Sequence, residues 1–434
     1  MSGLLRICTA GSVDDGKSTL IGRLLYDSRS VYEDQLHSIQ RASKNRSAGA
    51  IDFSLFTDGL RAEREQGITI DVAYRYFATA RRKFILADTP GHEQYTRNMA
   101  TGASTADVAI LLVDARHGVR PQSRRHAQIA RLLGIRDYVL AVNKMDLVDF
   151  DRRVFDTIVD EFDQILAGSR LHPIPISALH GDNVIGPSER TPWFSGQSLL
   201  EFLESVEVDR DTRSKPFRFP VQLVLRPTHE FRGYAGQILS GTVRKGDAVT
   251  IWPTGRTSRV KAIVTFDGEL ETAYAGQSVT LTLDDEIDIS RGDMITIGPI
   301  AAAQRFRADV VWMDERPLDP SRVYVLKHTT RTVTAEVDRA LELNHIGSVT
   351  ISTARPIMID GYVENRGTGS FIIIDPATNF TAGAGMIAEV MPDRPGARPT
   401  RSHAAERLAQ LARAADSEAD AVEAVRKALD ELLS

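Results

Sequence analysis

Cysteine is almost absent from this sequence, which has only Cys8 in 434 residues. A single cysteine cannot form a disulfide within the chain, so nothing here requires an oxidising compartment. Long apolar runs are absent as well: stretches such as residues 108–113 fall far short of the ~20 residues that a membrane helix needs. The N-terminal sequence MSGLLRICTAG has no basic leader followed by a long apolar stretch. We therefore expect a soluble, cytoplasmic protein that is not associated with a membrane.

A large excess of charge of either sign is also missing. Lys and Arg number 53 and Asp and Glu 58, which gives a formal net charge of −5. This balance argues against broad, non-specific nucleic-acid binding, although a local basic patch is compatible with it. Hydrophobic residues make up 42% and charged residues 26% of the chain, as in an average globular protein, and the length suggests about three domains.

The first half of the chain alternates short apolar runs with amphipathic helical patterns. Buried strands are predicted at residues 4–9, 83–87, 108–113, 138–142 and 172–176. The clearest helix pattern runs from Asp151 to Ala167, with its apolar residues on one face and Gly168 as a stop. Alternation of this kind predicts an α/β domain with a mostly parallel sheet and helices on both of its faces.

The pattern changes after residues 213–216. Short β-rich runs separated by Gly or Pro then recur about every 8–12 residues, which is typical of a small antiparallel barrel or sandwich. We therefore predict an N-terminal α/β domain (residues 1–210), two β-barrel domains (211–300 and 301–395) and a helical tail (396–434). The tail has the pattern of an amphipathic helix that packs on its own protein or docks a partner.

A phosphate-binding motif opens the chain, because residues 11–18 fit the pattern G-x-x-x-x-G-K-[ST] between a predicted strand and a predicted helix. Glycines let the backbone wrap around phosphates, and the N–H groups at a helix start direct partial positive charge at them. We expect Lys17 to neutralise the β- and γ-phosphates and Ser18 to ligate Mg²⁺. The predicted phosphate-binding residues of this loop are Gly11, Ser12, Val13, Asp14, Asp15, Gly16, Lys17, Ser18 and Thr19.

A second phosphate motif, Asp-Thr-Pro-Gly-His, lies at the end of another predicted strand. This position places Asp88 beside the magnesium ion and the Gly91 N–H at the γ-phosphate. His92 can orient the attacking water and respond to charge on the phosphate, at a position where many GTPases have Gln. The predicted phosphate contacts here are Asp88, Thr89, Pro90, Gly91 and His92, with His92 and Lys17 as catalytic residues.

Two further motifs at strand ends predict which base is bound. The Asp146 carboxylate of Asn-Lys-Met-Asp can accept the paired N–H groups of a guanine edge, which adenine does not offer. The segment Ser-Ala-Leu at residues 177–179 can present a backbone N–H to the guanine oxygen. Because open α/β sheets bind ligands at the carboxyl ends of their strands, four motifs in this order predict a GTP site. The predicted guanine-binding residues are Asn143, Lys144, Met145, Asp146, Ser177, Ala178 and Leu179.

A long polar insertion at residues 31–66 separates the phosphate loop from Asp88. Shortly after it, Thr69 is the best candidate to reach Mg²⁺ while a γ-phosphate is bound and to release it afterwards, as a two-state segment does. We predict Thr69 as a catalytic residue and, with Ser18 and Asp88, as a metal ligand. The alternative is that Thr69 is an ordinary strand threonine.

The motifs and the following barrels resemble the translation-factor class of GTPases, typified by elongation factor Tu, over residues 1–395. Longer strings are similar to the GTP-binding large subunit of bacterial sulfate adenylyltransferase. These strings include GSVDDGKSTLIGRLLYDS, TDGLRAEREQGITIDVAYRYF, ADTPGHEQYTRNMATGAS and YVLKHTTRTVTAEV. Tu-type factors usually have VDHGKTTL where this chain has VDDGKSTL, which favours the sulfate adenylyltransferase family.

The resemblance implies a nucleotidyltransferase complex in which this chain hydrolyses GTP, with Mg²⁺ as cofactor. A separate small catalytic subunit would bind ATP and sulfate and form adenosine 5′-phosphosulfate and pyrophosphate, the first step of sulfate assimilation toward cysteine. The partner implied is this small subunit, in a hetero-oligomer without nucleic acid or membrane. The residues fit such a division, because Asp146 commits the phosphate loop to guanine and no SGGKDS-like pyrophosphate loop is present.

One alternative stays open from the sequence: an elongation-type GTPase that delivers aminoacyl-tRNA has the same fold and phosphate-site residues. A second question concerns the C-terminus, because some members of the sulfate adenylyltransferase family carry an adenylylsulfate kinase there. Such a kinase would need a second phosphate loop after the barrels, and none occurs before Ser434.

Overall fold

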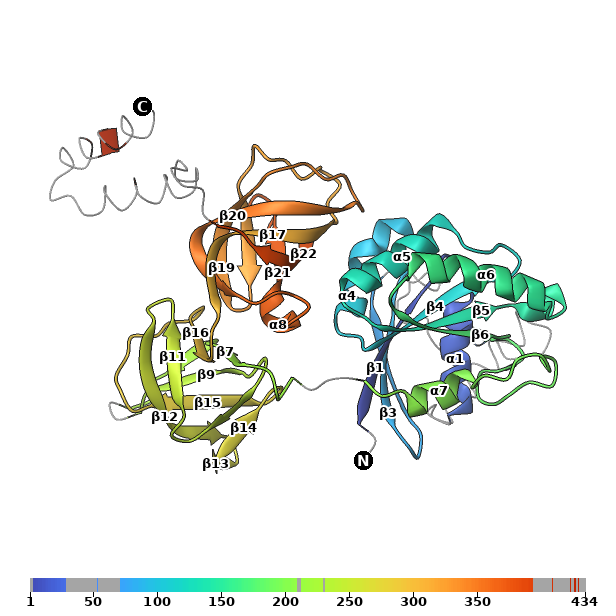
Figure 1. Cartoon of the computed structure of the whole chain (residues 1–434), viewed down its shortest axis with the longest axis horizontal. Coiled ribbons are helices and arrows are strands. Elements are labelled where there is room, and N and C mark those ends of the chain that lie inside the picture. Colours follow the sequence, from blue (N-terminus) through green and yellow to red (C-terminus); the bar gives the residue numbers. More distant parts are fainter. Residues whose placement is uncertain are drawn as a thin grey trace. The chain divides into compact units, whose positions relative to one another are not determined.

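The computed structural model describes residues 3–28, 53, 71–208, 212–228 and 231–392, together with Leu408, Val422, Val425, Arg426 and Ala428. The chain forms two compact units, Met1–Asp209 and Arg210–Ser434 (Figure 1). Thr69 and most of the predicted helical tail lie outside the described residues. Among the residues that are described, no helix has the length and apolar character needed to cross a membrane. The four-part division of the chain stays a prediction.

The described part of unit 1 is built on a six-stranded sheet with the order β2-β3-β1-β4-β5-β6. Its strands are β1 (Leu4–Ala10), β2 (Ala73–Ala78), β3 (Lys83–Asp88), β4 (Val108–Asp114), β5 (Asp137–Asn143) and β6 (Arg170–Pro175). β2 runs antiparallel to β3, and all other neighbours are parallel. β4 and β5 are buried along their whole length, as strands covered on both faces are. The predicted α/β class and mostly parallel sheet are confirmed.

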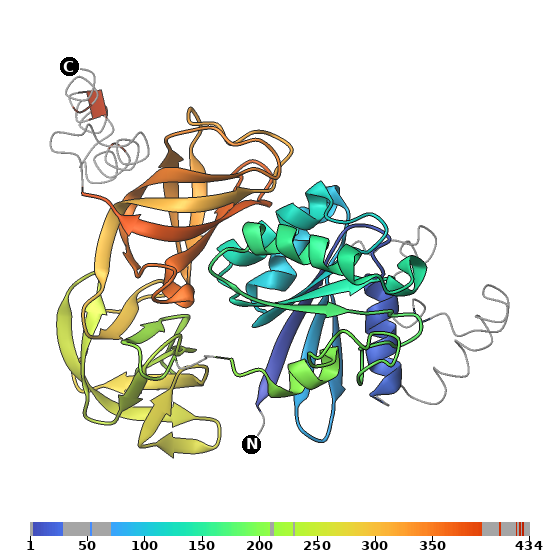
Figure 2. The ribbon, with the colours of Figure 1, turned by 45° about the vertical axis from the view of Figure 1, so that its right-hand side comes forward.

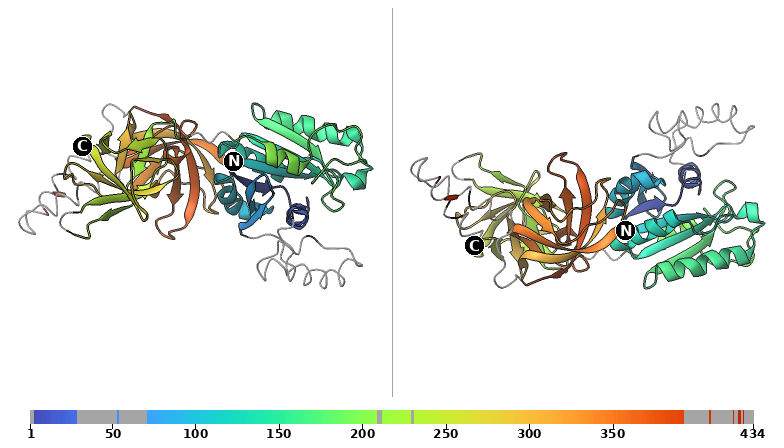
Figure 3. Two further views of the ribbon diagram at one scale, coloured as in Figure 1. Left: turned by 90° about the horizontal axis from the view of Figure 1, so that it is seen from below. Right: turned by 90° about the horizontal axis from the view of Figure 1, so that it is seen from above.

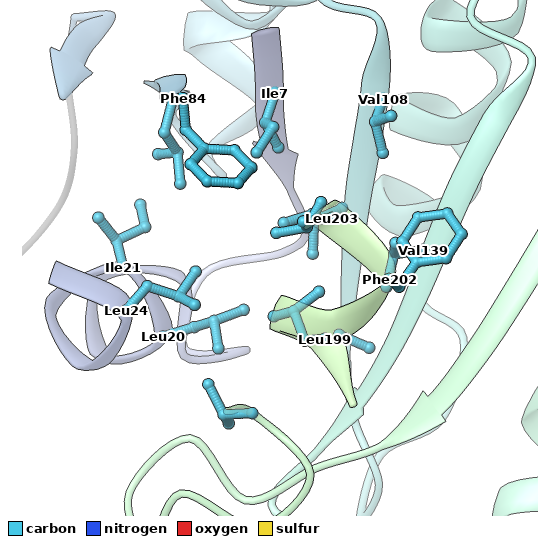
Figure 4. Packing of buried hydrophobic residues seen from close by; sticks show 14 of the residues in the cluster. Ile7, Leu20, Ile21, Leu24, Phe84, Val108, Val139, Leu199, Phe202 and Leu203 are labelled. Atoms are coloured by element: carbon cyan, nitrogen blue, oxygen red, sulfur yellow. The ribbon is translucent and has the colours of Figure 1, made fainter. Parts of the chain in front are cut away.

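Helices cover both faces of this sheet. They are α1 (Lys17–Asp27), α4 (Thr96–Ser104), α5 (Pro121–Leu132), α6 (Arg152–Ile165) and α7 (Leu199–Ser205), with the 3₁₀ turns η2 (Glu93–Tyr95) and η3 (Met145–Val148). α5 and α6 lie on one face, and α1 and α7 on the other (Figures 1 and 2). Figure 4 shows apolar side chains of α1 and α7 converging on strand residues in one core: Ile7, Leu20, Ile21, Leu24, Phe84, Val108, Val139, Leu199, Phe202 and Leu203.

The predicted helix at residues 151–167 is α6, which is slightly shorter. It begins after Asp151, whose carboxylate accepts a hydrogen bond from the Arg153 backbone N–H at 2.8 Å and so satisfies one unpaired donor of the first turn. Phe155, Ile158 and Phe162 are buried on one face at the three- and four-residue spacing of a helix. The sequence thus placed the helix correctly and misplaced its C-terminal end by two residues.

The first module of unit 2 is a curled antiparallel sheet, in which seven strands follow the order β7-β16-β11-β12-β15-β9-β8. β13 pairs with β12, and β10 pairs with β14. The strands are β7 (Phe217–Pro220), β8 (Leu223–Leu225), β9 (Gly233–Gln237), β10 (Thr242–Arg244), β11 (Ala248–Trp252), β12 (Arg256–Thr265), β13 (Gly268–Leu270), β14 (Thr272–Tyr274), β15 (Ser278–Leu283) and β16 (Met294–Ile297). Along β15, buried Val279, Leu281 and Leu283 alternate with more exposed neighbours, so one face packs into the core.

The second module closes into a barrel with the order β17-β20-β19-β18-β21-β22 (Figure 3). Its elements are β17 (Ala301–Trp312), β18 (Tyr324–His328), β19 (Arg331–Val337), β20 (Ile346–Ile359), α8 (Arg366–Gly369), β21 (Ser370–Ile374) and β22 (Thr381–Val390). Phe306, Trp312 and Tyr324 are among the large side chains that fill its interior. Closure leaves the barrel without free strand edges. The prediction of two barrel-like antiparallel modules is confirmed.

A buried arginine joins the two modules of unit 2. Arg218 on β7 donates from Nε and Nη2 to both carboxylate oxygens of Asp360, at 2.8 and 2.9 Å. Its guanidinium also donates to the backbone carbonyl oxygens of Ile297 and Pro299, and its side chain is only 2% exposed. A guanidinium that is removed from water needs such a set of acceptors, because burying it unpaired is very unfavourable. Arg218 and its acceptors therefore form one buried polar cluster that connects the two β-modules.

Candidate nucleotide site

The loop between β1 and α1 has a backbone that few residue types can adopt. Gly16 has φ +92°, and a Cβ at this position would collide with the side-chain amide of Asn143. A Cβ on Gly11 would lie 2.8 Å from the carbonyl oxygen of Leu112. Glycine is required at both places, once for conformation and once for close approach. The loop that the sequence predicts as a phosphate cradle is therefore held against β4 and the end of β5.

Lys17, the first residue of α1, lies inside this loop. Its ammonium donates to the carbonyl oxygens of Gly11 and Ser12, both at 2.9 Å, and the residue is 7% exposed. Burial lowers the pKa of the ammonium, and the carboxylates of Asp88 and Asp15 oppose that shift. The loop thus holds a cation at the position where the sequence predicts the β- and γ-phosphates.

Asp15 is an unusual member of a phosphate loop, because its carboxylate is buried. One oxygen accepts a hydrogen bond from the Ser12 backbone N–H at 2.6 Å. Burial raises the pKa of this carboxyl, while the Lys17 charge and the Ser12 N–H lower it. The Asp15 carboxylate therefore stabilises the turn of the loop through a hydrogen bond inside it. The hydroxyl of Ser12 in turn lies 3.2 Å from that of Ser123 near the start of α5, a contact that the sequence did not suggest.

The segment after β3 packs directly on the phosphate loop. The Thr89 hydroxyl donates to the Thr9 carbonyl oxygen at 2.5 Å, which ties the end of β3 to the end of β1. Asp88 is 1% exposed and lies within 3.5 Å of the Thr9 hydroxyl. A Cβ on Gly91 would collide with the Lys17 ammonium and lie 2.8 Å from the Gly11 carbonyl oxygen. The structure therefore brings Asp88, Gly91 and Lys17 together.

His92 follows Gly91 and is exposed. It caps η2, where its Nδ1 accepts a hydrogen bond from the Gln94 backbone N–H at 3.3 Å. In the neutral ring this bond leaves the proton on Nε2, which makes that atom a donor. The side chain is therefore available beside the phosphate loop rather than used in packing.

The Asn-Lys-Met-Asp motif connects the phosphate loop to the third strand-end motif. The Asn143 amide donates to the Asp15 carbonyl oxygen at 2.8 Å and accepts from the Ala178 N–H at 2.9 Å. The Lys144 ammonium donates to the Asp14 carbonyl oxygen at 2.5 Å. Met145 is fully buried. The first two side chains thus hold backbone segments in place, although the sequence assigned all three residues to the base itself.

Asp146 provides the carboxylate of this motif; its side chain is 11% exposed, and one of its oxygens lies 3.7 Å from Nε2 of His180. The sequence prediction also missed Asp114 at the end of β4, which binds Lys144 at 2.9 Å and Arg116 at 2.7 Å. Although burial would raise the pKa of Asp114, these two cations hold it well below its usual range. Only the position of Asp114 at a strand end could have indicated this role.

Sequence comparison finds matches to known families in both units of the chain. The profile of the Elongation factor Tu GTP binding domain matches residues 2–209, that of Elongation factor Tu domain 2 matches 234–296, and that of the GTP-eEF1A C-terminal domain-like family matches 305–388. Sulfate adenylyltransferase subunit 1 of Bacteroides thetaiotaomicron is 54% identical over 419 residues, which cover 89% of this chain and 86% of the relative.

The chain belongs to the sulfate adenylyltransferase subunit 1 family. Its relative in Teredinibacter turnerae is 53% identical over 411 residues, which cover 89% of this chain and 88% of the relative. The Bifunctional enzyme NodQ of Rhizobium meliloti is 54% identical over 408 residues, but the chain spans only 64% of that protein. Within the family, unit 1 is a GTP-binding domain of the elongation factor Tu type. The expected resemblance to both groups is confirmed.

Proposed function

We propose that this chain is the GTPase subunit of sulfate adenylyltransferase. GTP hydrolysis here is coupled to formation of adenosine 5′-phosphosulfate and pyrophosphate from ATP and sulfate, which a partner small subunit carries out in the cytoplasm. The observation that carries the proposal is the 54% identity to a sulfate adenylyltransferase subunit 1 over 89% of the chain. The relative's name, subunit 1, implies a second subunit. This explains why a guanine site occurs in a chain that contributes to adenylyl transfer.

Magnesium fits the residues that surround Lys17. Mg²⁺ prefers one or two protein oxygens and takes its other ligands from phosphates and water. Asp88 supplies a buried carboxylate and Ser18 a half-buried hydroxyl at the first turn of α1. The described residues contain no group of three His, Cys, Asp or Glu side chains that would hold the ion without phosphates. We assign Ser18, Asp88 and, outside the described residues, Thr69 as ligands; the bound ion would neutralise charge between the phosphates.

The proposed hydrolysis step gives a role to each of three groups. The Lys17 ammonium stabilises negative charge on the phosphates, and the Gly91 N–H donates to the γ-phosphate. His92, with Nε2–H as a donor, orients the attacking water and meets the charge that grows on the γ-phosphate. The contact of Gly91 with Lys17 supports this arrangement, because it places the His92 backbone next to the phosphate loop.

Changing Asp146 to Asn should convert the base preference from GTP to XTP. A carboxylate accepts both N–H groups of the guanine edge, whereas an amide offers one acceptor and a donor that suits the xanthine oxygen. We expect GTP affinity to fall on the order of 100-fold and XTP to become the tighter ligand. Competition between the two nucleotides in equilibrium binding measures this. Asp149→Asn, an exposed aspartate three residues away, is the matched control; an unchanged preference in Asp146→Asn would remove Asp146 from the base site.

The decisive test of the function is pyrophosphate release from ATP and sulfate by the chain co-expressed with its small subunit, with and without GTP. Sulfate-dependent release that GTP stimulates, and that is lost in Lys17→Ala but kept in the exposed-lysine control Lys83→Ala, is the expected result. If GTP has no effect in a well-formed complex, the coupling proposal fails. Binding of aminoacyl-tRNA would then be measured, since the elongation-type function is the remaining candidate.

A further inference from the structure

One arginine outside the predicted site contacts the loop that carries guanine recognition. Arg23 lies on α1, the helix that begins at the phosphate loop, and its side chain is 22% exposed. Its Nη1 donates to the backbone carbonyl oxygen of Leu179 at 3.2 Å. Leu179 is the last residue of the predicted guanine segment, so the side chain joins the phosphate-binding helix to the base-binding loop.

The guanidinium of Arg23 is held from three further directions. Its Nε donates to Asp27, one helical turn later, at 2.6 Å. Its central carbon lies 5.2 Å from the centre of the Phe53 ring, within cation–π range. On the loop side, the backbone of Gly181 lies against the guanidinium, since a Cβ at this position would lie 2.5 Å from Nη2. A side chain confined in this way loses little further entropy when it fixes a carbonyl group.

The Arg23 contact complements one that Asn143 of the Asn-Lys-Met-Asp motif already supplies. The Ala178 N–H is held by the Asn143 amide at 2.9 Å, and the carbonyl oxygen of the following residue, Leu179, is held by Arg23. Two anchors on adjacent residues restrict both translation and rotation of the intervening peptide. This peptide carries the Leu179 N–H, a donor that would meet the guanine oxygen.

We propose that Arg23 is a positioning residue for guanine recognition. It fixes the loop of residues 177–181 relative to α1, so that discrimination between guanine and adenine depends on a side chain that does not touch the base. This inference rests on the guanine site proposed above. It predicts a loss of base selectivity without a loss of phosphate binding or of chemistry.

The experiment measures equilibrium affinities of GTP, GDP and ATP, turnover at saturating GTP, and thermal unfolding for the full chain. In Arg23→Ala, GTP and GDP affinity should fall about 5- to 10-fold, the range for one lost charge-assisted hydrogen bond at a partly exposed site. ATP affinity should stay constant, so the preference for GTP over ATP falls by the same factor. Turnover at saturation should remain within about twofold of wild type, since His92 and Lys17 keep their contacts.

Two further variants separate positioning from a structural role. Arg23→Lys retains a donor for Leu179 and should restore part of the preference, while Asp27→Asn loosens the guanidinium and should lower it in the same direction. The control is Arg152→Ala, which removes a similar pair four residues apart, with Asp156 on α6. Equal losses for GTP and ATP with a lower unfolding temperature would overturn the proposal, as would an unchanged preference in Arg23→Ala. A wild-type chain that binds GTP no better than ATP would overturn the guanine site itself.

Discussion

Replacing His92 by alanine is expected to lower GTP turnover about 100-fold and to leave GTP affinity close to that of the wild type. The ring lies outside the contacts that hold the phosphate loop, and its only described hydrogen bond is the one that Nδ1 accepts from the Gln94 N–H. Ground-state binding by Lys17 and Gly91 therefore survives the substitution. The lost contribution belongs to the transition state, in which the water and the γ-phosphate carry developing charge.

Single-turnover hydrolysis of bound GTP, measured beside equilibrium binding, distinguishes these two effects. His345→Ala removes an exposed histidine of unit 2 and serves as the control. His92→Gln should retain part of the activity, because the amide also donates toward the γ-phosphate. Turnover in His92→Ala equal to that of the wild type would show that another group orients the water.

The fold class was predictable from the sequence because the hydrophobic patterns of its two parts differ clearly. Continuous apolar runs at β4 and β5 predict strands buried on both faces, and their full burial follows from that. The alternation along β15 predicts a strand with one buried face. Closure was less predictable: within the described residues, the second module forms a ring of paired strands and the first a curled open sheet, and closure depends on long-range pairings such as β17 with β22.

The geometry of the candidate nucleotide site was predictable where local pattern and chemistry coincide. The geometry of the loop itself requires Gly16 and Lys17, and both residues are part of the G-x-x-x-x-G-K-[ST] motif. The supporting residues were not predictable in the same way. Asp114 at the end of β4 binds Lys144, which follows the neighbouring strand β5. Arg23 binds Leu179, which is 156 positions away in the sequence. Such pairs need the register of the folded sheet, and neither residue was among the predicted site residues.

The roles within a motif were also partly hidden. Asn143 and Lys144 occupy the same four-residue pattern as Asp146, which led to one assignment for all of them. Their hydrogen bonds to the carbonyl oxygens of Asp15 and Asp14 show that they hold the phosphate loop. A pattern records that residues occur together, whereas the direction of each side chain depends on the backbone: Lys144 has φ +62°, a left-handed conformation at the residue between β5 and η3.

The largest expected effect on stability comes from Arg218→Ala in unit 2. Removal of the guanidinium takes two hydrogen bonds from the Asp360 carboxylate, which is 13% exposed. Among its described contacts, the carboxylate then keeps only the hydrogen bond from the Thr368 hydroxyl, at 2.5 Å. The substitution also takes a donor from the carbonyl oxygens of Ile297 and Pro299. Breaking a buried ion pair from one side costs about 3–5 kcal/mol, because the remaining charge stays desolvated. Arg256→Ala, at an exposed position on β12, should cost less than ~0.5 kcal/mol.

The three tryptophans allow unit 2 to be followed alone. Trp252 and Trp312 belong to unit 2, so urea unfolding in a Trp193→Phe background reports on that unit. The double variant Arg218→Ala with Asp360→Ala should be more stable than the sum of the single losses predicts, since neither charge is then left unpaired. Additive losses would mean that the two side chains act independently.

The pH dependence gives the same pair a second test. Although burial would raise the pKa of Asp360, hydrogen bonds from Arg218 and Thr368 hold it below its ordinary value. A carboxyl whose folded-state pKa is lowered contributes stability above its unfolded pKa of about 3.9 and loses that contribution as the pH falls through the lower, folded-state value. The difference in unfolding free energy between wild type and Arg218→Ala should therefore be constant near neutral pH. It should shrink as the pH falls from the Asp360 pKa of the folded variant, which lacks the guanidinium, toward the lower pKa of the folded wild type. A difference that stays constant down to the acid-unfolding limit would mean that packing of the arginine side chain, rather than its charge, stabilises the junction of the two β-modules.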